Sequence, residues 1–278
     1  MLKIIACLTM LVDHVGYTFF PQQLWLRVIG RIAFPLFCWY VARGFSRTRS
    51  RRKYLARLAL WGVVSQIPFA LLFYHASFDN PLSLLKGLNV MFTFCFALVG
   101  LWLIDVCRGR HWGLQLLSWA AYALLGVAAG LLHTDYDLYG VLLVLLCYAF
   151  GMPRPATAAA GAGTAGTDAA AGTGTAGMDA AAAAMPQVPA APGANPGGTS
   201  AQIRWKPWNL MLPGSVLLLT YVFVQLEMMS WLQLFCVAAI PLLWLRLPDP
   251  APGRWKHAFY AFYPAHILVL YVMAVVIR

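Results

Sequence analysis

The chain contains 278 residues, of which 61% are hydrophobic and only 10% are charged. Because an ordinary soluble domain has roughly a quarter of its residues charged, this composition excludes the soluble class. The formal net charge of +11 at pH 7 could indicate a nucleic-acid partner, and the placement of the basic residues decides whether it does.

Apolar runs of about 16 to 20 residues recur along the chain, close to the roughly 20 that a helix needs to cross a bilayer. Such continuous blocks argue against a β-barrel, whose strands alternate apolar and polar residues. We therefore predict an all-α fold, a polytopic transmembrane helical bundle of about nine helices, with eight or ten as alternatives. In chain order the predicted helices lie near residues 2–20, 28–45, 55–74, 88–106, 112–131, 137–151, 208–225, 230–246 and 258–277.

A segment without large side chains separates two helical blocks. Residues 156–184 are almost entirely Ala, Gly and Thr, and a stretch rich in Pro, Gly and Ala continues to about residue 200. Because such a segment has little to bury, we predict a disordered cytoplasmic insert at 153–203. It would join six helices at 1–152 to three helices at 204–278, and we expect both blocks to pack as one membrane domain.

The basic residues gather on one side of the predicted bundle. If the N-terminus is cytoplasmic, most of the 20 Lys and Arg residues lie on the cytoplasmic side. The residues that fall on the other side are Arg27, Arg31, Lys86 and Arg278. This asymmetry follows the positive-inside rule. We therefore expect membrane lipid and no nucleic acid as a partner, with the C-terminus on the side opposite the N-terminus.

Ionisable side chains inside the predicted spans are the strongest functional signal, because at membrane depth they usually face a cavity or a partner. Asp13 and His14 are adjacent in the first helix but point about 100° apart, so we expect His14 to find its partner on another helix. Arg27 and Arg31 lie one turn apart at the start of the second helix. Pro35 should kink that helix, so that both arginines can reach Asp13. A purely structural ion pair is the competing interpretation.

Other polar residues extend this candidate site. Asn89 and Asp135 lie in predicted outer loops, and Tyr263 and His266 lie near the middle of the last helix. The alternating acidic residues around Asp135 predict no metal site, because carboxylates in a loop are usually solvated. The six cysteines stand singly, without a CxxC pair, and we expect them to pack as small hydrophobic side chains.

A basic run follows the second predicted helix on the cytoplasmic side. Its residues include Arg43, Arg47, Arg51, Arg52 and Lys53. Topology and anionic lipid headgroups are two sufficient explanations for such a run. A third is binding of the phosphates of a cytosolic donor such as coenzyme A, because guanidinium groups suit phosphates.

Several motifs resemble the TraX family of membrane proteins. They are KIIA at 3–6, MLVDHVG at 10–16, RVIGRIAFPLF at 27–37, GFSRT at 44–48, SQIPF at 65–69, LNVMFT at 88–93, DYDLYG at 135–140 and FYAFYPAH at 259–266. The resemblance covers nearly all of the helical chain and leaves out the predicted insert. It implies a multi-pass protein of the bacterial cytoplasmic (inner) membrane. In that membrane the distribution of basic residues predicts a cytoplasmic N-terminus and insert and a periplasmic C-terminus.

The family's named activity is acetylation of the N-terminus of conjugative pilin, and the family looks related to polytopic membrane acyltransferases. The resemblance therefore implies acetyl transfer from acetyl-CoA to an amine or hydroxyl of a pilin or another envelope molecule. We expect His14 to be the general base, with Asp13 positioning the site. Arg31 and Asn89 would stabilise the oxyanion.

The remaining candidate residues belong to substrate and donor binding. Arg27, Asp135, Tyr263 and His266 would line the substrate path, and the basic run would hold acetyl-CoA. Two other functions fit the residues. Buried His, Asp and Arg between broken helices are also typical of proton-coupled secondary transporters, and a non-catalytic partner in the assembly of a surface structure is a further alternative. The acceptor, the acyl chain length and the oligomeric state stay open.

Overall fold

The computed structural model describes residues 1–151, 207–244 and 256–277. Within these ranges all regular elements are helical, and the strand-like pairing among them is limited to an isolated bridge between Leu88 and Thr134. The all-α prediction is thus confirmed. The described helices belong to one compact unit. The predicted insert at 153–203 lies outside the described residues.

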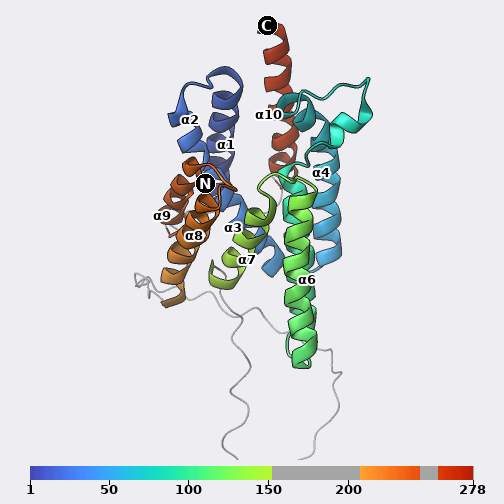
Figure 1. Cartoon of the computed structure of the whole chain (residues 1–278), viewed down its shortest axis with the longest axis vertical. Coiled ribbons are helices and arrows are strands. Elements are labelled where there is room, and N and C mark those ends of the chain that lie inside the picture. Colours follow the sequence, from blue (N-terminus) through green and yellow to red (C-terminus); the bar gives the residue numbers. More distant parts are fainter. Residues whose placement is uncertain (152–206, 245–255, 278) are drawn as a thin grey trace, which may run out of the picture. The chain divides into compact units, whose positions relative to one another are not determined.

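The helices follow the predicted order (Figure 1). Their bounds are α1 Leu2–Phe19, α2 Leu24–Gly30, α3 Ala33–Arg47, α4 Arg51–Phe73, η1 Pro81–Leu85, α5 Val90–Cys107, α6 Trp112–Leu131, α7 Asp137–Gly151, α8 Pro207–Gln225, η2 Trp231–Ala238, α9 Ala239–Trp244 and α10 Lys256–Ile277. In these residues six stretches are long and apolar enough to cross a membrane, and three shorter helical stretches are apolar. The protein is therefore a multi-pass membrane protein.

Two predicted helices are interrupted. The helix predicted at 28–45 begins at Leu24 and breaks after Gly30, and a separate helix α3 begins at Ala33. We predicted a kink at Pro35, but Pro35 lies in the first turn of α3. A proline ring clashes with the carbonyl four residues earlier, here that of Arg31, so the helix ends before the proline and restarts around it.

The same rule explains the second interruption. The helix predicted at 230–246 is a 3₁₀-helix, η2, followed by the short helix α9. Pro241 lies in the first turn of α9, and the carbonyl four residues earlier belongs to Val237. The helix that we predicted there is therefore present, but it changes from 3₁₀ to α geometry at Ala239.

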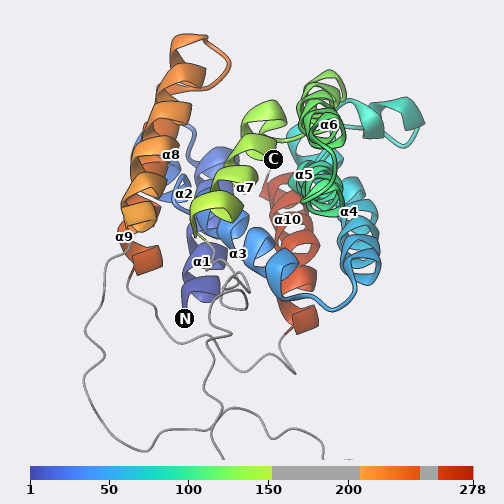
Figure 2. The ribbon, with the colours of Figure 1, turned by 90° about the horizontal axis from the view of Figure 1, so that it is seen from below.

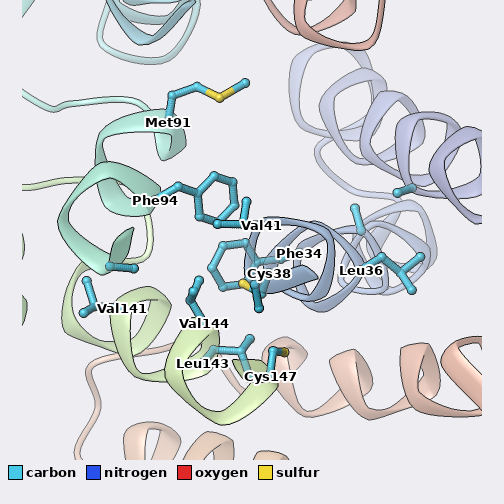
Figure 3. Packing of buried hydrophobic residues seen from close by; sticks show 14 of the residues in the cluster. Phe34, Leu36, Cys38, Val41, Met91, Phe94, Val141, Leu143, Val144 and Cys147 are labelled. Carbon is cyan, nitrogen blue, oxygen red and sulfur yellow. The ribbon is translucent and has the colours of Figure 1, made fainter. Parts of the chain in front are cut away.

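Helix α3 lies at the centre of the apolar core and contacts α1, α5, α7 and α9 (Figure 2). Its buried side chains Phe34, Cys38 and Val41 meet residues of α5 and α7 (Figure 3). Cys38 and Cys147 are almost fully buried and the cysteines of the described chain are free thiols. Cys38 and Cys147 thus pack as small hydrophobic side chains, as predicted.

Helices α1, α2, α4 and α10 position the polar residues of the candidate site. Helix α10 packs against both α1 and α4, and α2 packs against α1. Gly30 permits the close approach of α2 to α1, because a Cβ atom at this position would lie 2.2 Å from the Cβ of Asp13. The glycine thereby brings both arginines of the α2 segment to Asp13.

Gln66 joins α4 to the segment that precedes α5. Its amide group donates to the carbonyls of Leu84 and Gly87 at 2.8 and 2.7 Å, and its oxygen accepts from Asn89. We expect Gln66→Leu to lower the free energy of unfolding by about 1–3 kcal/mol, because it leaves buried backbone groups without partners. Thermal unfolding in detergent measures this, with the exposed Gln22→Leu as control. Equal stability of the two variants would contradict the prediction.

Candidate functional site

Asp13 on α1 binds both arginines of the α2 segment. The Nη2 atom of Arg31 donates to both carboxylate oxygens of Asp13 at 2.8 Å. The Nε atom of Arg27 forms an ion pair with Asp13 at 3.0 Å. The side chains of Asp13 and Arg31 are each only 13% exposed. The ion cluster expected from the sequence is therefore formed, and its carboxylate is fully occupied by two cations.

The remaining contacts of Arg31 fix the plane of its guanidinium group. Its Nε donates to the carbonyl of Arg27 at 3.3 Å, and its Nη1 donates to Oε1 of Gln233 at 3.3 Å. Gln233 comes from η2 and is almost fully buried. We did not predict Gln233 as a site residue. A polar side chain inside the apolar stretch Trp231–Leu243 was the signal that could have identified it.

His14 pairs with His266 of α10. The Nδ1 atom of His14 lies 2.8 Å from the Nε2 atom of His266, which confirms that its partner comes from another helix. The Nδ1 atom of His266 lies 2.7 Å from the carbonyl oxygen of Phe262. The edge of Phe73 meets the His14 ring at a centroid distance of 5.1 Å. His14 is half-buried, and the positive charge of Arg31 lies close enough to act on its ring.

Asp135 lies in the connection between α6 and α7, close to the ion cluster. Its backbone N–H donates to the carbonyl of Leu88 at 2.7 Å, and its carbonyl accepts from the hydroxyl of Thr93. Burial raises the pKa of the Asp135 carboxyl group to about 7, although the nearby positive charge of Arg31 opposes this shift. Asp135 is therefore a carboxyl group that can hold or release a proton near neutral pH.

Tyr136 closes the same side of the site. Its ring stacks on Phe34 of α3 at a centroid distance of 3.6 Å. Burial raises the pKa of the Tyr136 phenol well above its usual value, with Arg31 acting in the opposite direction. Tyr136 lies in the DYDLYG motif at 135–140, but we did not predict it as a site residue. It provides an aromatic wall beside Arg31.

Asn89 does not join these groups. Its amide nitrogen donates to the carbonyl of Gly62 at 2.7 Å and to Oε1 of Gln66 at 2.9 Å. Its side-chain oxygen caps α5 by accepting from Met91. Since both amide hydrogens have partners, Asn89 has none left for an oxyanion, and the structure does not support the role that we predicted for it. Tyr263 is buried on α10, with its ring 5.9 Å from that of His266.

The predicted donor-binding residues lie at the opposite end of α3 from Arg31. The 15 residues of α3 correspond to about 22 Å. Arg43 packs over the ring of Trp39, and Arg51 forms an ion pair with Asp105. The exposed members of the set are Arg47, Arg52 and Lys53. These exposed cations present their charge to the surroundings.

Two cavities lie near other parts of the described helices. One of about 440 Å³ is lined by Val15, Phe20, Gln23, Trp25 and Leu26, at the end of α1 that carries the ion cluster. The other, of about 120 Å³, lies between α5 and α6. None of the predicted site residues lines either one. Among the described residues no group of three His, Cys, Asp or Glu side chains is arranged to hold a metal ion.

The sequence model of the family described as TraX protein matches residues 1–196. The chain belongs to the TraX family. The match includes Asp13, His14, Arg27 and Arg31. It also extends into the predicted insert at 153–203, which the resemblance based on motifs did not include. It ends before α8, so the TraX match does not include Gln233 or His266.

Two curated relatives of this TraX family member are a protein named for fimbrial assembly and a protein named TraX. It is 30% identical over 151 residues to the "Probable fimbrial assembly protein FimC, serogroup H1" of Dichelobacter nodosus, which covers 52% of this chain and 59% of that protein. It is 29% identical over 151 residues to the Protein TraX of Escherichia coli, which covers 53% of this chain and 54% of that protein. Each match thus spans less than two thirds of the relative. No solved structure matches the chain.

Proposed function

We propose that this TraX family member is an integral membrane acyltransferase that moves an acetyl group from acetyl-CoA to an amine or hydroxyl acceptor. The observation that carries the proposal is the His14–His266 pair, which lies on α1 and α10 beside the ion cluster of Asp13 and Arg31. An imidazole next to a fixed guanidinium group provides the two elements that acyl transfer from a thioester needs: a proton acceptor and a stabiliser of developing negative charge.

His14 takes a proton from the acceptor nitrogen or oxygen as that atom attacks the thioester carbonyl carbon. Arg31 stabilises the negative charge that develops on the carbonyl oxygen. The carbon–sulfur bond then breaks, and the proton on His14 passes to the leaving thiolate of coenzyme A. Asp13 acts as a positioning residue, because its two hydrogen bonds hold the guanidinium group of Arg31 in place.

Asp135, Arg27 and Tyr263 belong to the acceptor side in this proposal. The pKa of about 7 lets the Asp135 carboxylate attract an acceptor ammonium group and accept a proton from it. The ring of Tyr136, stacked on Phe34, limits the space next to Asp135. In this proposal Asp135 binds the acceptor amine near Arg31.

The start of α4 supports a phosphate-binding role for the basic run. Ser50 caps this helix, and Arg51, Arg52 and Lys53 follow in its first turn, which contains no acidic residue. Cations are unfavourable at the positive end of a helix dipole, whereas phosphates bind there readily. The arrangement thus suits an anionic partner, and we propose the phosphates of acetyl-CoA, with lipid headgroups as the competing anion.

Replacement of the two exposed cations in the first turn of α4, Arg52→Ala with Lys53→Ala, is expected to raise the KM for acetyl-CoA several-fold and to leave kcat nearly unchanged. The reason is that these residues would contact the donor's phosphates and no reacting atom. Steady-state kinetics in nanodiscs measure both constants. Arg110→Ala serves as control, because Arg110 is an exposed basic residue on the same predicted side. A similar KM for variant and control would show that these cations do not bind acetyl-CoA and instead contact lipid headgroups or set the membrane orientation.

We further propose a bacterial cytoplasmic membrane location, with the N-terminus and the 153–203 segment in the cytoplasm and the C-terminus in the periplasm. The distribution of basic residues supports this orientation. The name of the fimbrial assembly relative supports an acceptor in the envelope, such as a pilin. In this arrangement the donor enters at the end of α3 that carries Arg47, and the acceptor at the end that carries Arg31.

A direct experiment tests the reaction. The purified protein is incubated with isotopically labelled acetyl-CoA and pilin peptides that have a free N-terminus, and mass spectrometry follows the label. We expect label on the peptide and free coenzyme A in equal amounts. The fimbrial relative's name favours one alternative, a non-catalytic membrane partner in assembly. Restored pilus assembly by a variant lacking both His14 and Arg31 would support that alternative and contradict the enzyme.

A further inference from the structure

The contacts of His266 determine where its hydrogen lies. Its Nδ1 atom is 2.7 Å from the carbonyl oxygen of Phe262. A carbonyl oxygen only accepts hydrogen bonds, so Nδ1 of His266 must carry the hydrogen. In a neutral imidazole the other nitrogen then has a free lone pair. The lone pair of His266 is therefore on Nε2, the atom that faces His14.

The hydrogen of His14 follows from this assignment. Its Nδ1 atom lies 2.8 Å from Nε2 of His266, a hydrogen-bond distance. Because His266 offers a lone pair there, His14 must donate from Nδ1. The ring planes differ by only 8° and the centroids are 5.0 Å apart. The distance between the centroids matches the nitrogen–nitrogen distance plus the radii of both rings. The two rings therefore meet edge to edge and lie in nearly one plane. This is the geometry that a good hydrogen bond requires.

Neighbouring charges in this arrangement disfavour a positive charge on His14. A carboxylate beside an imidazole would favour protonation, but the Asp13 carboxylate is occupied by Arg27 and Arg31. The positive charges of these arginines also act on His14 and oppose a further positive charge there. Aromatic rings hold both imidazoles: Phe262 stacks on His266 at 4.8 Å, and Phe73 meets His14 edge-on.

We propose that His266 is a positioning residue that fixes His14 in the tautomer with hydrogen on Nδ1 and a lone pair on Nε2. The chain of hydrogen bonds runs from His14 Nδ1 to His266 Nε2, and from His266 Nδ1 to the carbonyl of Phe262. A second histidine and a backbone carbonyl thus perform the orienting task that a carboxylate performs for many catalytic histidines. The base of the reaction is then Nε2 of His14, and this last step rests on the proposed acyltransferase function.

Two variants of His266 test whether His14 needs a hydrogen-bond acceptor at this position or only a ring of similar shape. In His266→Gln the side-chain oxygen lies near the former Nε2 position and accepts the hydrogen of His14. In His266→Phe the ring shape remains, but the acceptor is lost. We expect the Gln variant to keep kcat within a few-fold of the wild type and the Phe variant to lose about 100-fold or more in kcat, with little change in KM. His257→Gln, an exposed histidine of the same helix, is the control.

The tautomer can be observed without any activity. Solid-state NMR of protein labelled with nitrogen-15 in its six histidines distinguishes Nδ1–H from Nε2–H, and the His14 signals are assigned by their loss in His14→Gln. We expect Nδ1–H at His14 in the wild type and in His266→Gln, and a changed or mixed tautomer in His266→Phe.

Each outcome has a separate meaning. Nε2–H at His14 in the wild type, or loss of Nδ1–H in the Gln variant, would overturn the inference. An unchanged tautomer in the Phe variant would overturn it as well. If the tautomers behave as expected but no acetyl transfer is found for any acceptor, the acyltransferase proposal fails while the positioning role of His266 stands.

Discussion

His14→Gln is expected to lower the rate of acetyl transfer by about 100- to 10,000-fold, the range typical for loss of a general base. The glutamine amide can still donate to His266, so the contact between α1 and α10 is kept. It has no basic lone pair, and the acceptor would keep its proton. The measurement is transfer of labelled acetyl from acetyl-CoA to a pilin peptide under single-turnover conditions, which isolate chemistry from product release.

His257→Gln is the matched control for this variant, since His257 is an exposed histidine at the far end of α10. It should transfer acetyl at the wild-type rate. Thermal unfolding of both variants should stay close to that of the wild type. If His14→Gln folds normally and transfers acetyl at the wild-type rate, His14 is not the base.

Asp13→Asn is expected to lower the free energy of unfolding by about 3–5 kcal/mol, the cost typical for breaking a buried ion pair from one side. The change keeps the shape of the side chain, which matters because Gly30 leaves no spare room at this position. It removes the negative charge that compensates Arg27 and Arg31. Unfolding in mixed detergent micelles gives the free energies.

A double-mutant cycle with Arg31→Gln identifies the cause. If the loss arises from an uncompensated buried cation, the double variant should be much more stable than the sum of the two single losses predicts. Asp79→Asn, an exposed aspartate in the loop after α4, should have little effect. An additive cycle would show that Asp13 and Arg31 stabilise the protein independently of each other.

Much of the fold was predictable because a bilayer imposes one strict rule, that a spanning backbone must satisfy its own hydrogen bonds. Solid apolar blocks therefore predicted α1 and α4 to within a few residues. The pairing of Asp13 with Arg27 and Arg31 was also predictable, because helical spacing places both arginines on one face and a buried carboxylate needs a cation. Spacing likewise showed that His14 needs a partner from another helix.

Other features depended on contacts that spacing along the chain does not encode. Gln233 reaches Arg31 across 202 residues of sequence, and only the packing of η2 against α2 brings them together. Asn89 could be recognised as a polar residue, but its commitment to Gln66 and Gly62 was not visible without the fold. The helix break at Arg31 was missed because we assigned the effect of Pro35 to the proline itself and not to the carbonyl it displaces.

The proline-induced breaks in the α2–α3 and η2–α9 segments have an electrostatic consequence. Arg31 directly follows the end of α2, and its guanidinium group reaches Gln233 of η2, so a charged group is held among apolar helices. In such surroundings the effective permittivity is far lower than that of water, and a point charge acts on a nearby carbonyl dipole several times more strongly. The interrupted backbone thereby places the Arg31 guanidinium group, already held by Asp13, where its field on nearby polar groups is stronger than it would be in water.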